Sequence, residues 1–293
     1  MSHQDKRTVV ITGGTGGIGY HSALGIAQSG ARVVITGRNQ ARGEAAQRQL
    51  SEESNNTDVE FVIGDLSSIA GIDALAHKLL ARCERIDVLV NNAGYLGSVL
   101  QNNEDGFEMH FAVNVLAPHR LTLALLPALK RAEQARVLNI TGGDKPARID
   151  ADNLQAEKGF KGLMTYTHSK SILEAMSLTM AESLQHEGVF VNLVFPGRAS
   201  TAMTRSLSPK ALPGLMKIMY PFFRVFFKED GGKSAAKAAR STIWAATNPA
   251  LKGVAGQYFD THMKKQKLHP TAYDTDVQAK ILGLLEGSAH SEG

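Results

Sequence analysis

The sequence of 293 residues contains one cysteine, Cys83, and no long apolar segment. A single cysteine excludes an internal disulfide and a cysteine-rich metal site, so we expect Cys83 to be a small buried hydrophobic residue. A membrane-spanning helix needs roughly 18 or more apolar residues, and no such run occurs. The polar start, MSHQDKRT, also lacks the apolar core of a signal peptide. The sequence therefore predicts a soluble, cytoplasmic protein.

Motifs for metal and nucleic-acid binding are scarce as well. The ten histidines form no HExxH pattern and no set with ligand spacing, so no metal site is expected. We expect His110, His119 and His168 to be packing or surface residues. The basic run 264–267 lacks the interleaved aromatic side chains of a single-stranded nucleic-acid site, so no nucleic-acid partner is expected.

Seven short runs rich in β-branched and apolar residues have the length of buried parallel strands. They cover residues 8–11, 31–36, 60–65, 86–94, 135–141, 189–197 and 256–260. Helical patterns lie at residues 17–28, 70–82, 107–126, 165–187 and 234–247. The alternation predicts the α/β class: a doubly wound parallel sheet (Rossmann fold) with helices on both faces. No linker divides residues 1–293, so one domain is expected, with an insertion at about 201–228 over the carboxyl ends of the strands.

The first strand runs into a glycine-rich turn, TGGTGGIG, at residues 12–19. Glycines let the backbone approach a pyrophosphate, whose charge is stabilised at the amino terminus of the following helix. Arg38 lies 19 residues after Gly19, near the end of the second strand, where an NAD site would carry an acidic residue. A guanidinium can instead hold a 2′-phosphate, which favours NADP(H) over NAD(H). The alternative is a solvated surface arginine.

Tyr166 and Lys170 are four residues apart in YTHSK and share one face of a predicted helix. The ordinary tyrosine pKa of about 10 is too high for easy proton exchange at neutral pH. A neighbouring ammonium and an oxidised nicotinamide would both lower this pKa. The pair is therefore a candidate acid/base site, and its alternative is an exposed tyrosine and lysine pair.

These motifs together resemble the short-chain dehydrogenase/reductase family. The resemblance rests on the glycine-rich turn, Asp65-Leu66, NNAG at 91–94, Asn114, YTHSK at 166–170 and Pro196-Gly197 with Thr201. It covers nearly the whole chain in the family's order. The phrase HFAVNVLAPHRLT and the ending HPTAYDTDVQAKILGLLE look most like the retinol-dehydrogenase branch.

The resemblance implies a role for each matching residue. Tyr166 would exchange a proton with a substrate carbonyl or alcohol, and Lys170 would hold the nicotinamide ribose and lower the tyrosine pKa. Asn114 would keep a water in line with Lys170, unless its amide only bonds backbone. Asp65 would meet the adenine, and Thr201 would bind the carboxamide. The implied cofactor-binding residues are Gly13, Thr15, Gly17, Ile18, Gly19, Arg38, Asp65, Leu66, Asn92, Ala93, Gly94, Tyr166, Lys170, Pro196, Gly197 and Thr201.

One position departs from the family pattern. The family usually has a serine just past the fifth strand, where its hydroxyl bonds the reacting oxygen, but this chain has Gly142 there. Loss of one such donor can cost on the order of 100- to 1,000-fold in rate. Three possibilities stay open: Thr141 takes over, the substrate brings its own hydroxyl, or the protein binds cofactor without useful turnover.

The apolar and aromatic segment 212–227 is expected to cover the active site and to admit a hydrophobic small molecule. Between Arg205 and Lys267, twelve basic residues face three acidic ones, so contact with a membrane surface is a further possibility. The predicted function is NADP(H)-dependent interconversion of a carbonyl and an alcohol. Two alternatives are reduction of a C=C bond on the same fold and a cofactor-binding sensor or scaffold. The resemblance also implies a homo-oligomer paired through the helices that carry Asn114 and Tyr166.

Overall fold

An eight-stranded sheet forms the centre of the protein in the computed structural model, which describes residues 6–142, 147–201, 204, 211 and 230–287. The strand order is β3-β2-β1-β4-β5-β6-β7-β8. The strands are β1 Thr8–Ile11, β2 Arg32–Gly37, β3 Val59–Ile63, β4 Val88–Asn91, β5 Ala135–Ile140, β6 Val189–Val194, β7 Tyr258–Phe259 and β8 Lys265–Gln266. Strands β1 to β7 pair in parallel, which confirms the predicted doubly wound sheet.

The eighth strand was not predicted. It contains only Lys265 and Gln266, both exposed, and pairs antiparallel to β7 at the edge of the sheet. Asp260 closes the turn before it, since its carboxylate accepts the backbone N–H groups of His262 and Lys264. A two-residue polar strand has no apolar alternation, so the sequence carries no signal for it.

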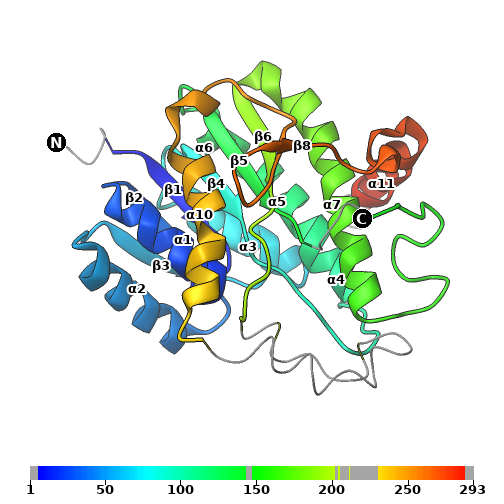
Figure 1. The fold of residues 1–293 in the computed structure, drawn as a ribbon, viewed down its shortest axis with the longest axis horizontal. Helices are drawn as coiled ribbons and strands as arrows, with labels where there is room; N and C mark the ends of the chain where they lie inside the picture. Colours follow the sequence, from blue (N-terminus) through cyan, green and yellow to red (C-terminus); the bar gives the residue numbers. More distant parts are fainter. Residues whose placement is uncertain (1–5, 143–146, 202–203, 205–210, 212–229, 288–293) are drawn as a thin grey trace.

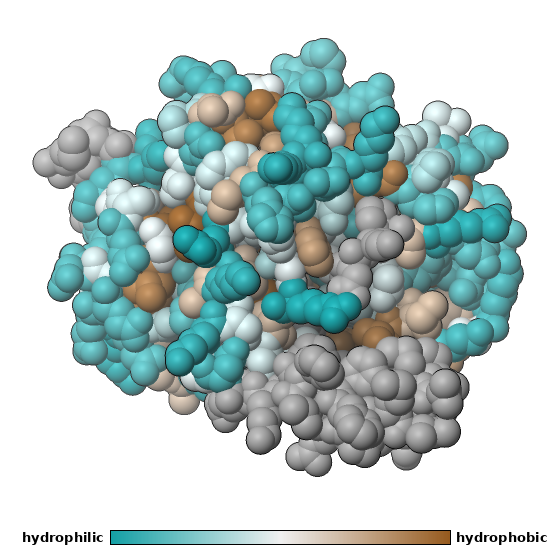
Figure 2. All heavy atoms as spheres, viewed as in Figure 1, coloured by the Kyte–Doolittle hydropathy of each residue, from teal (hydrophilic) through white to brown (hydrophobic). Residues whose placement is uncertain are grey.

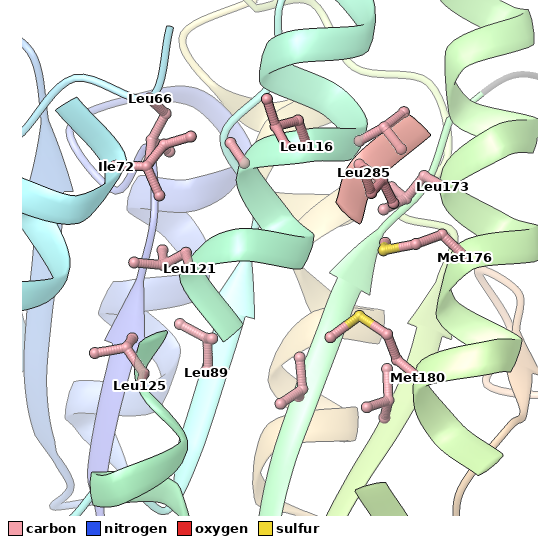
Figure 3. Packing of buried hydrophobic residues seen from close by; sticks show 14 of the residues in the cluster. Leu66, Ile72, Leu89, Leu116, Leu121, Leu125, Leu173, Met176, Met180 and Leu285 are labelled. Atoms are coloured by element: carbon pink, nitrogen blue, oxygen red, sulfur yellow. The ribbon is translucent and has the colours of Figure 1, made fainter. Parts of the chain in front are cut away.

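Two layers of helices cover the sheet (Figure 1). Alternate strand residues point to opposite faces: Val9 and Ile11 pack in one apolar cluster, and Val10 in the other. One face is covered by α1 Gly17–Gln28, α2 Gln40–Ser54 and α10 Lys233–Thr247. The other is covered by α3 Ile69–Leu80, α5 Ala117–Ala124, α7 Leu163–Leu184 and α11 Thr275–Gly287, whose leucines and methionines interlock above the strands (Figure 3).

The predicted helix over 107–126 is interrupted. It consists of α4 Met109–Phe111, a π-helical turn at Ala112–Leu116, α5, and a further short helix, α6 Leu126–Leu129. Pro118 stands at the start of α5 and Pro127 at the start of α6. A proline has no N–H to donate to the carbonyl four residues earlier, so the regular ladder cannot continue.

The predicted insertion at 201–228 lies outside the described residues, except for residues 201, 204 and 211. Within the described part of the chain, no helix is both long and apolar enough to cross a membrane. The face shown in Figure 2 is mainly hydrophilic, with apolar side chains exposed in small separate patches.

Candidate active site

The chain reverses its direction of winding between β1 and β4, and the loops after these two strands are tied together. Asn92 and Ala93 both donate their backbone N–H groups to the Thr12 hydroxyl at 3.0 Å. The Asn92 amide donates to the carbonyls of Thr12 (2.9 Å) and Gly13 (3.3 Å). Ligands of such sheets bind outside the carboxyl ends of the strands at this reversal. Asn92 therefore holds the glycine-rich turn against the loop after β4.

Several glycines of the glycine-rich turn have no room for a side chain. Gly13 and Gly17 have positive φ angles of 65° and 56°. A Cβ on Gly19 would stand 2.4 Å from the carbonyl oxygen of Gly13, and one on Gly17 would stand 3.1 Å from the Thr201 methyl group. The backbone at the start of α1 is thus bare, which fits a pyrophosphate held by helical N–H groups.

Two arginines, Arg38 and Arg42, follow β2 in the sequence. Arg38 follows β2 and is exposed, as is Arg42 in the first turn of α2. The Arg42 guanidinium lies 3.8 Å from the Cβ position of Gly16. Arg42 was not predicted. Its signal was the spacing of four residues from Arg38, which places the two arginines on either side of the first residues of α2. Asn39 caps this helix by accepting the Arg42 N–H. The two cations fit a phosphate on the adenosine ribose.

Other predicted cofactor residues have mainly structural contacts. The exposed Asp65 accepts the N–H of Ser67 at 3.0 Å, and Leu66 is buried in the core. Gly197 has a positive φ of 86°, and the Thr201 N–H donates to the Thr204 hydroxyl at 2.8 Å. Thr15 packs against Gly37; Ile18 packs against the small cluster around Ala199.

Tyr166 and Lys170 meet Gly142 at the carboxyl end of β5, as the sequence predicts. A Cβ on Gly142 would stand 2.6 Å from Tyr166 Oη and 3.4 Å from Lys170 Cγ. The phenolic hydroxyl thus occupies the space that a side chain at 142 would fill. The buried Lys170 ammonium donates to the carbonyl of Ile140 at 2.9 Å.

Burial dominates the titration of these groups. It raises the pKa of Tyr166 to about 12 and lowers the pKa of Lys170 to about 8, against the attraction of Glu174. The predicted lowering of the tyrosine pKa is therefore not found in the chain alone, because burial removes the phenolate from water. Without cofactor, Tyr166 keeps its proton at neutral pH.

Thr141 does not turn its hydroxyl toward the reacting position in this structure. Its Oγ1 is buried and donates to Glu174 Oε1 at 2.5 Å. Burial raises the pKa of Glu174 to about 7, while the Thr141 hydrogen bond and the Lys170 charge lower it. Glu174 was not predicted; its position one helical turn after Lys170 was the available signal.

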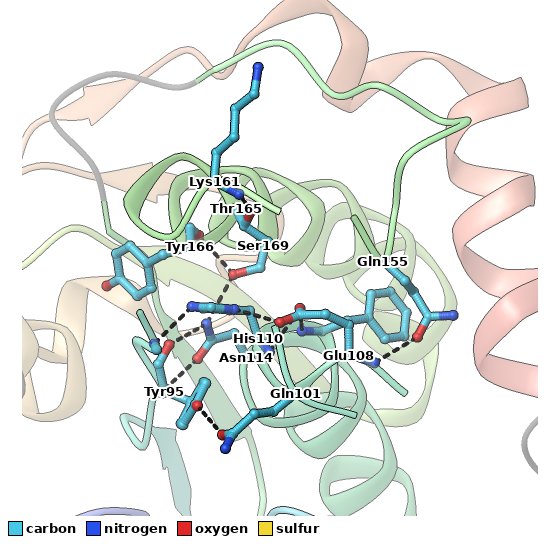
Figure 4. A network of polar contacts seen from close by, with 12 residues as sticks. Tyr95, Gln101, Glu108, His110, Asn114, Gln155, Lys161, Thr165, Tyr166 and Ser169 are labelled. Atoms are coloured by element: carbon cyan, nitrogen blue, oxygen red, sulfur yellow. Dashed lines mark hydrogen bonds and ion pairs between the residues drawn. The ribbon is translucent and has the colours of Figure 1, made fainter. Parts of the chain in front are cut away.

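Asn114 lies in the π-helical turn, fully buried, and its amide is completely engaged (Figure 4). Its Nδ2 donates to the Tyr95 carbonyl (3.0 Å) and the Ser169 hydroxyl (2.9 Å), and its Oδ1 accepts the Tyr95 N–H (2.8 Å). The side chain therefore bonds backbone, the alternative left open by the sequence. The Asn114 carbonyl loses its usual helical donor because residue 118 is proline. This carbonyl is the group of Asn114 that suits a bound water.

Gly94 completes the group. Its Cβ position lies 3.4 Å from Asn114 Oδ1 and 3.8 Å from Lys170 Nζ. Gly94 is exposed, whereas both of these side chains are buried behind it. The structure thus brings Gly94, Asn114, Gly142, Tyr166 and Lys170 together from four parts of the sequence.

The three singled-out histidines have packing roles, as predicted. His110 and His119 are buried, and burial lowers the pKa of His119 to about 4. The Nε2 of His168 accepts the Asp150 N–H at 2.9 Å. Among the described residues, no three His, Cys, Asp or Glu side chains group as metal ligands.

Comparisons with known proteins agree with this geometry. The family model "short chain dehydrogenase" matches residues 7–212. The chain is 32% identical over 279 residues to retinol dehydrogenase 13 of Mus musculus, covering 94% of this chain and 81% of that protein. It is 31% identical over 288 residues to polyprenol dehydrogenase of Homo sapiens, covering 94% and 82%. The solved complex of Pseudomonas aeruginosa RhlG with NADP is 28% identical, with a TM-score of 0.64 and coverage of 87% and 94%.

Proposed function

Because the chain belongs to the short-chain dehydrogenase/reductase family, on its retinol-dehydrogenase-like branch, we propose that it interconverts a carbonyl and an alcohol on an apolar small molecule. The observation that carries this proposal is that the Tyr166 hydroxyl and the Lys170 side chain both lie against Gly142. These residues lie near the reversal point of the sheet, where the bare glycine-rich turn fits a nicotinamide dinucleotide.

In this mechanism Tyr166 moves the proton. A nicotinamide cofactor, when bound, would supply or accept the hydride. Burial holds the Tyr166 pKa near 12, so the resting phenol carries the proton that a substrate carbonyl oxygen needs. Lys170 contributes a buried ammonium on the same face of α7 as the phenol, and the Asn114 carbonyl, to which Pro118 cannot donate, would provide a place for a water that returns the proton.

The cofactor preference follows from the two arginines at the adenosine end. Arg38 and Arg42 present exposed guanidiniums at the start of α2, and no described contact neutralises either one with a carboxylate. A 2′-phosphate would supply that negative charge. We therefore propose NADP(H) over NAD(H), in agreement with the NADP held by the related RhlG structure.

The substrate side is apolar. Val99 and Leu100 in the loop after β4, and Met164 just before Tyr166, are each more than half exposed. Large apolar side chains held in water on both sides of a site favour an apolar ligand.

Gly142 supports a second candidate function. Glycine offers no donor to the reacting oxygen, and the neighbouring Thr141 hydroxyl is already bonded to Glu174. A protein that binds NADP(H) with little turnover, or that reduces a C=C bond, needs this donor less.

Consumption of NADPH with a panel of apolar aldehydes, ketones and enones, and of NADH in parallel, tests these proposals. The carbonyl function predicts turnover of an aldehyde or ketone with NADPH preferred. Tight NADPH binding without turnover of any compound would favour the sensor. Turnover of enones alone at their C=C bond would favour the second reductase.

A further inference from the structure

His110 lies in the interior beneath the active site, and both of its ring nitrogens are bonded (Figure 4). Its Nε2 accepts the backbone N–H of Gly97 at 3.0 Å. Since Nε2 accepts, the ring proton is assigned to Nδ1, which donates to Glu108 Oε1 at 2.7 Å. The imidazole is therefore held in one tautomer and one orientation.

Glu108 is itself fixed, so the histidine has a rigid support. The other carboxylate oxygen of Glu108 accepts the backbone N–H groups of His110 (2.9 Å) and Phe111 (3.1 Å) at the start of α4. The Glu108 N–H donates to the Gln155 side chain at 3.1 Å. The histidine thus links α4 to the loop after β4 through a short chain of buried polar contacts.

The His110 ring also contacts aromatic side chains from two segments. Its centroid lies 5.1 Å from Tyr95, in the loop after β4. It lies 5.6 Å from Phe160 and 6.4 Å from Tyr166, which bracket the start of α7. We call residues 95–101 and residues 160–166 the two walls. The His110 ring therefore contacts both walls and lies beside the Tyr166 phenol.

The two walls carry three of the exposed large apolar side chains of the described chain. Val99 and Leu100 are 52% and 54% exposed on one wall, and Met164 is 54% exposed on the other. A group that fixes the spacing of the walls also fixes the spacing of these side chains. This spacing would affect the binding of the part of a substrate that extends past the reacting carbonyl.

We propose that His110 is a positioning residue for substrate recognition: it holds the two walls at the spacing that admits the apolar portion of the substrate. The proposal rests on the proposed oxidoreductase function. It assigns the Gly97 bond, rather than ring volume alone, as the contact that matters. If His110 only filled space in the core, its substitution would lower the stability of the protein and would change the KM values of all substrates by the same factor.

Two substitutions separate these roles. In His110→Asn the amide can still donate to Glu108 but does not reach Gly97. In His110→Gln the longer side chain brings an amide oxygen to the place of Nε2, where it can accept the Gly97 N–H. Both lose the aromatic ring, so their difference reports the Gly97 bond.

The experiment measures KM and kcat for a short and a long-chain aldehyde and KM for NADPH, with thermal unfolding as a folding control. We expect His110→Asn to raise KM for the long aldehyde about tenfold, as for loss of one buried hydrogen bond, with the short aldehyde and NADPH changed less than about twofold. His110→Gln should recover the part of this loss that the Gly97 bond accounts for, while the part due to the ring contact with Phe160 stays lost. Phe160→Ala, which removes the contact on the other wall, should raise the same KM ratio.

Each outcome decides between the claims. Absence of turnover by the unaltered protein overturns the proposed function, and this inference with it. Turnover with an unchanged ratio of the two aldehyde KM values in His110→Asn overturns the inference alone. If His110→Asn does not fold, an unchanged ratio in Phe160→Ala overturns it.

Discussion

Gly142 and Tyr166 share one small space, and this sets the chemistry of the site. A Cβ at residue 142 would lie only 2.6 Å from the phenolic oxygen, which is closer than van der Waals contact allows. The site therefore has a closely packed acid at the reacting position and no second side-chain donor from residue 142. Catalysis by such a site depends on where the Tyr166 hydroxyl lies rather than on a pair of donors.

Gly142→Ala tests the importance of that position. The added methyl group must push the Tyr166 hydroxyl away by about 1 Å, and a displacement of this size can cost roughly 100-fold in rate. We expect kcat to fall about 10- to 100-fold with NADPH affinity kept. Gly142→Ser is the matched control, because it adds the same Cβ with a donor. Unchanged kcat in the alanine variant would show that the hydroxyl does not act from this place.

The buried pair Lys170 and Glu174 predicts a dip in stability with pH. Glu174, raised from 4.5 to about 7, binds more protons when folded, so its contribution is lost as pH rises between these values. Lys170, lowered from 10.5 to about 8, binds fewer protons when folded, so stability recovers between pH 8 and 10.5. The contribution of this pair is therefore smallest between about pH 7 and 8.

Denaturant unfolding of the cofactor-free protein from pH 5 to 10 measures this dip. Glu174→Gln keeps an acceptor for Thr141 but cannot ionise. The variant should lose the decline between pH 5 and 7, which is on the order of 3 kcal/mol in the unaltered protein. Parallel pH curves for the two proteins would contradict the assignment.

The spacing of Tyr166 and Lys170 predicted that they share one helix face, as they do on α7, and the family resemblance pointed to Gly142 as the residue that follows the fifth strand. Glu174 and His110 could not be found in this way. The sequence does not show whether a glutamate or a histidine is solvated or buried. The hydrogen-bond partners of these two residues, Thr141 and Gly97, are also distant from them in the sequence. The role of Asn92 was likewise hidden, since its amide is taken by the turn after β1.

At the scale of elements, the π-helical turn at Ala112–Leu116 connects the core to the site. It carries Asn114, whose amide ties the loop after β4 to Ser169 on α7. π-turns within α-helices occur often at functional sites. Here Pro118 explains why the regular ladder stops, and the buried amide explains why the loop stays in place.

Asn114→Ala should lower both stability and activity. It leaves the Tyr95 N–H without its partner, so we expect a loss of about 2 to 4 kcal/mol in the free energy of unfolding. The loop near Lys170 should also shift, and kcat should fall at temperatures where the variant is folded. Asn139→Ala is the control: this buried amide bonds Asn91 and Ser177. It should lower stability alone, and a similar kcat in both variants would contradict the role of Asn114.

The sequence predicted elements with strong apolar runs and missed those without. The seven buried strands and α1 were predicted within a few residues. Helices α2 and α11 were not predicted. In α2 only Gly43, Ala46 and Leu50 are buried, which leaves a weak apolar stripe. Its clearest signal was Asn39, whose side chain caps the helix by accepting the Arg42 N–H.

At the scale of the whole molecule, one continuous sheet with an apolar cluster on each face joins the parts of the site. Residues that follow β1, β4 and β5 meet because these strands are neighbours in that sheet. Helix α7 packs on one face of the same sheet and brings its residues to them. We therefore propose that residues 1–293 act as one domain. The βαβ alternation predicted this class of arrangement, whereas the contacts at the reversal point required the structure.

Cofactor binding should stabilise the whole molecule. A ligand at 100 times its Kd adds about 2.7 kcal/mol to the free energy of unfolding, so saturating NADPH should raise Tm measurably. The double variant Arg38→Ala/Arg42→Ala should weaken NADPH binding about tenfold or more, since each guanidinium loses a charged contact. Its NADH affinity should stay within about twofold. Equal losses for both nucleotides would contradict the assignment of these arginines to a 2′-phosphate.

The most direct test of the account compares Tyr166→Phe with Tyr95→Phe. Both remove one phenolic oxygen near the site, but the Tyr95 hydroxyl bonds only the exposed side chain of Gln101 among the contacts described. We expect Tyr166→Phe to lower kcat/KM for carbonyl reduction by about 100- to 10,000-fold while NADPH still binds, because the proton donor is gone. Tyr95→Phe should keep kcat near the unaltered value. Turnover by Tyr166→Phe at the rate of the unaltered protein would contradict the central claim that this phenol supplies the proton.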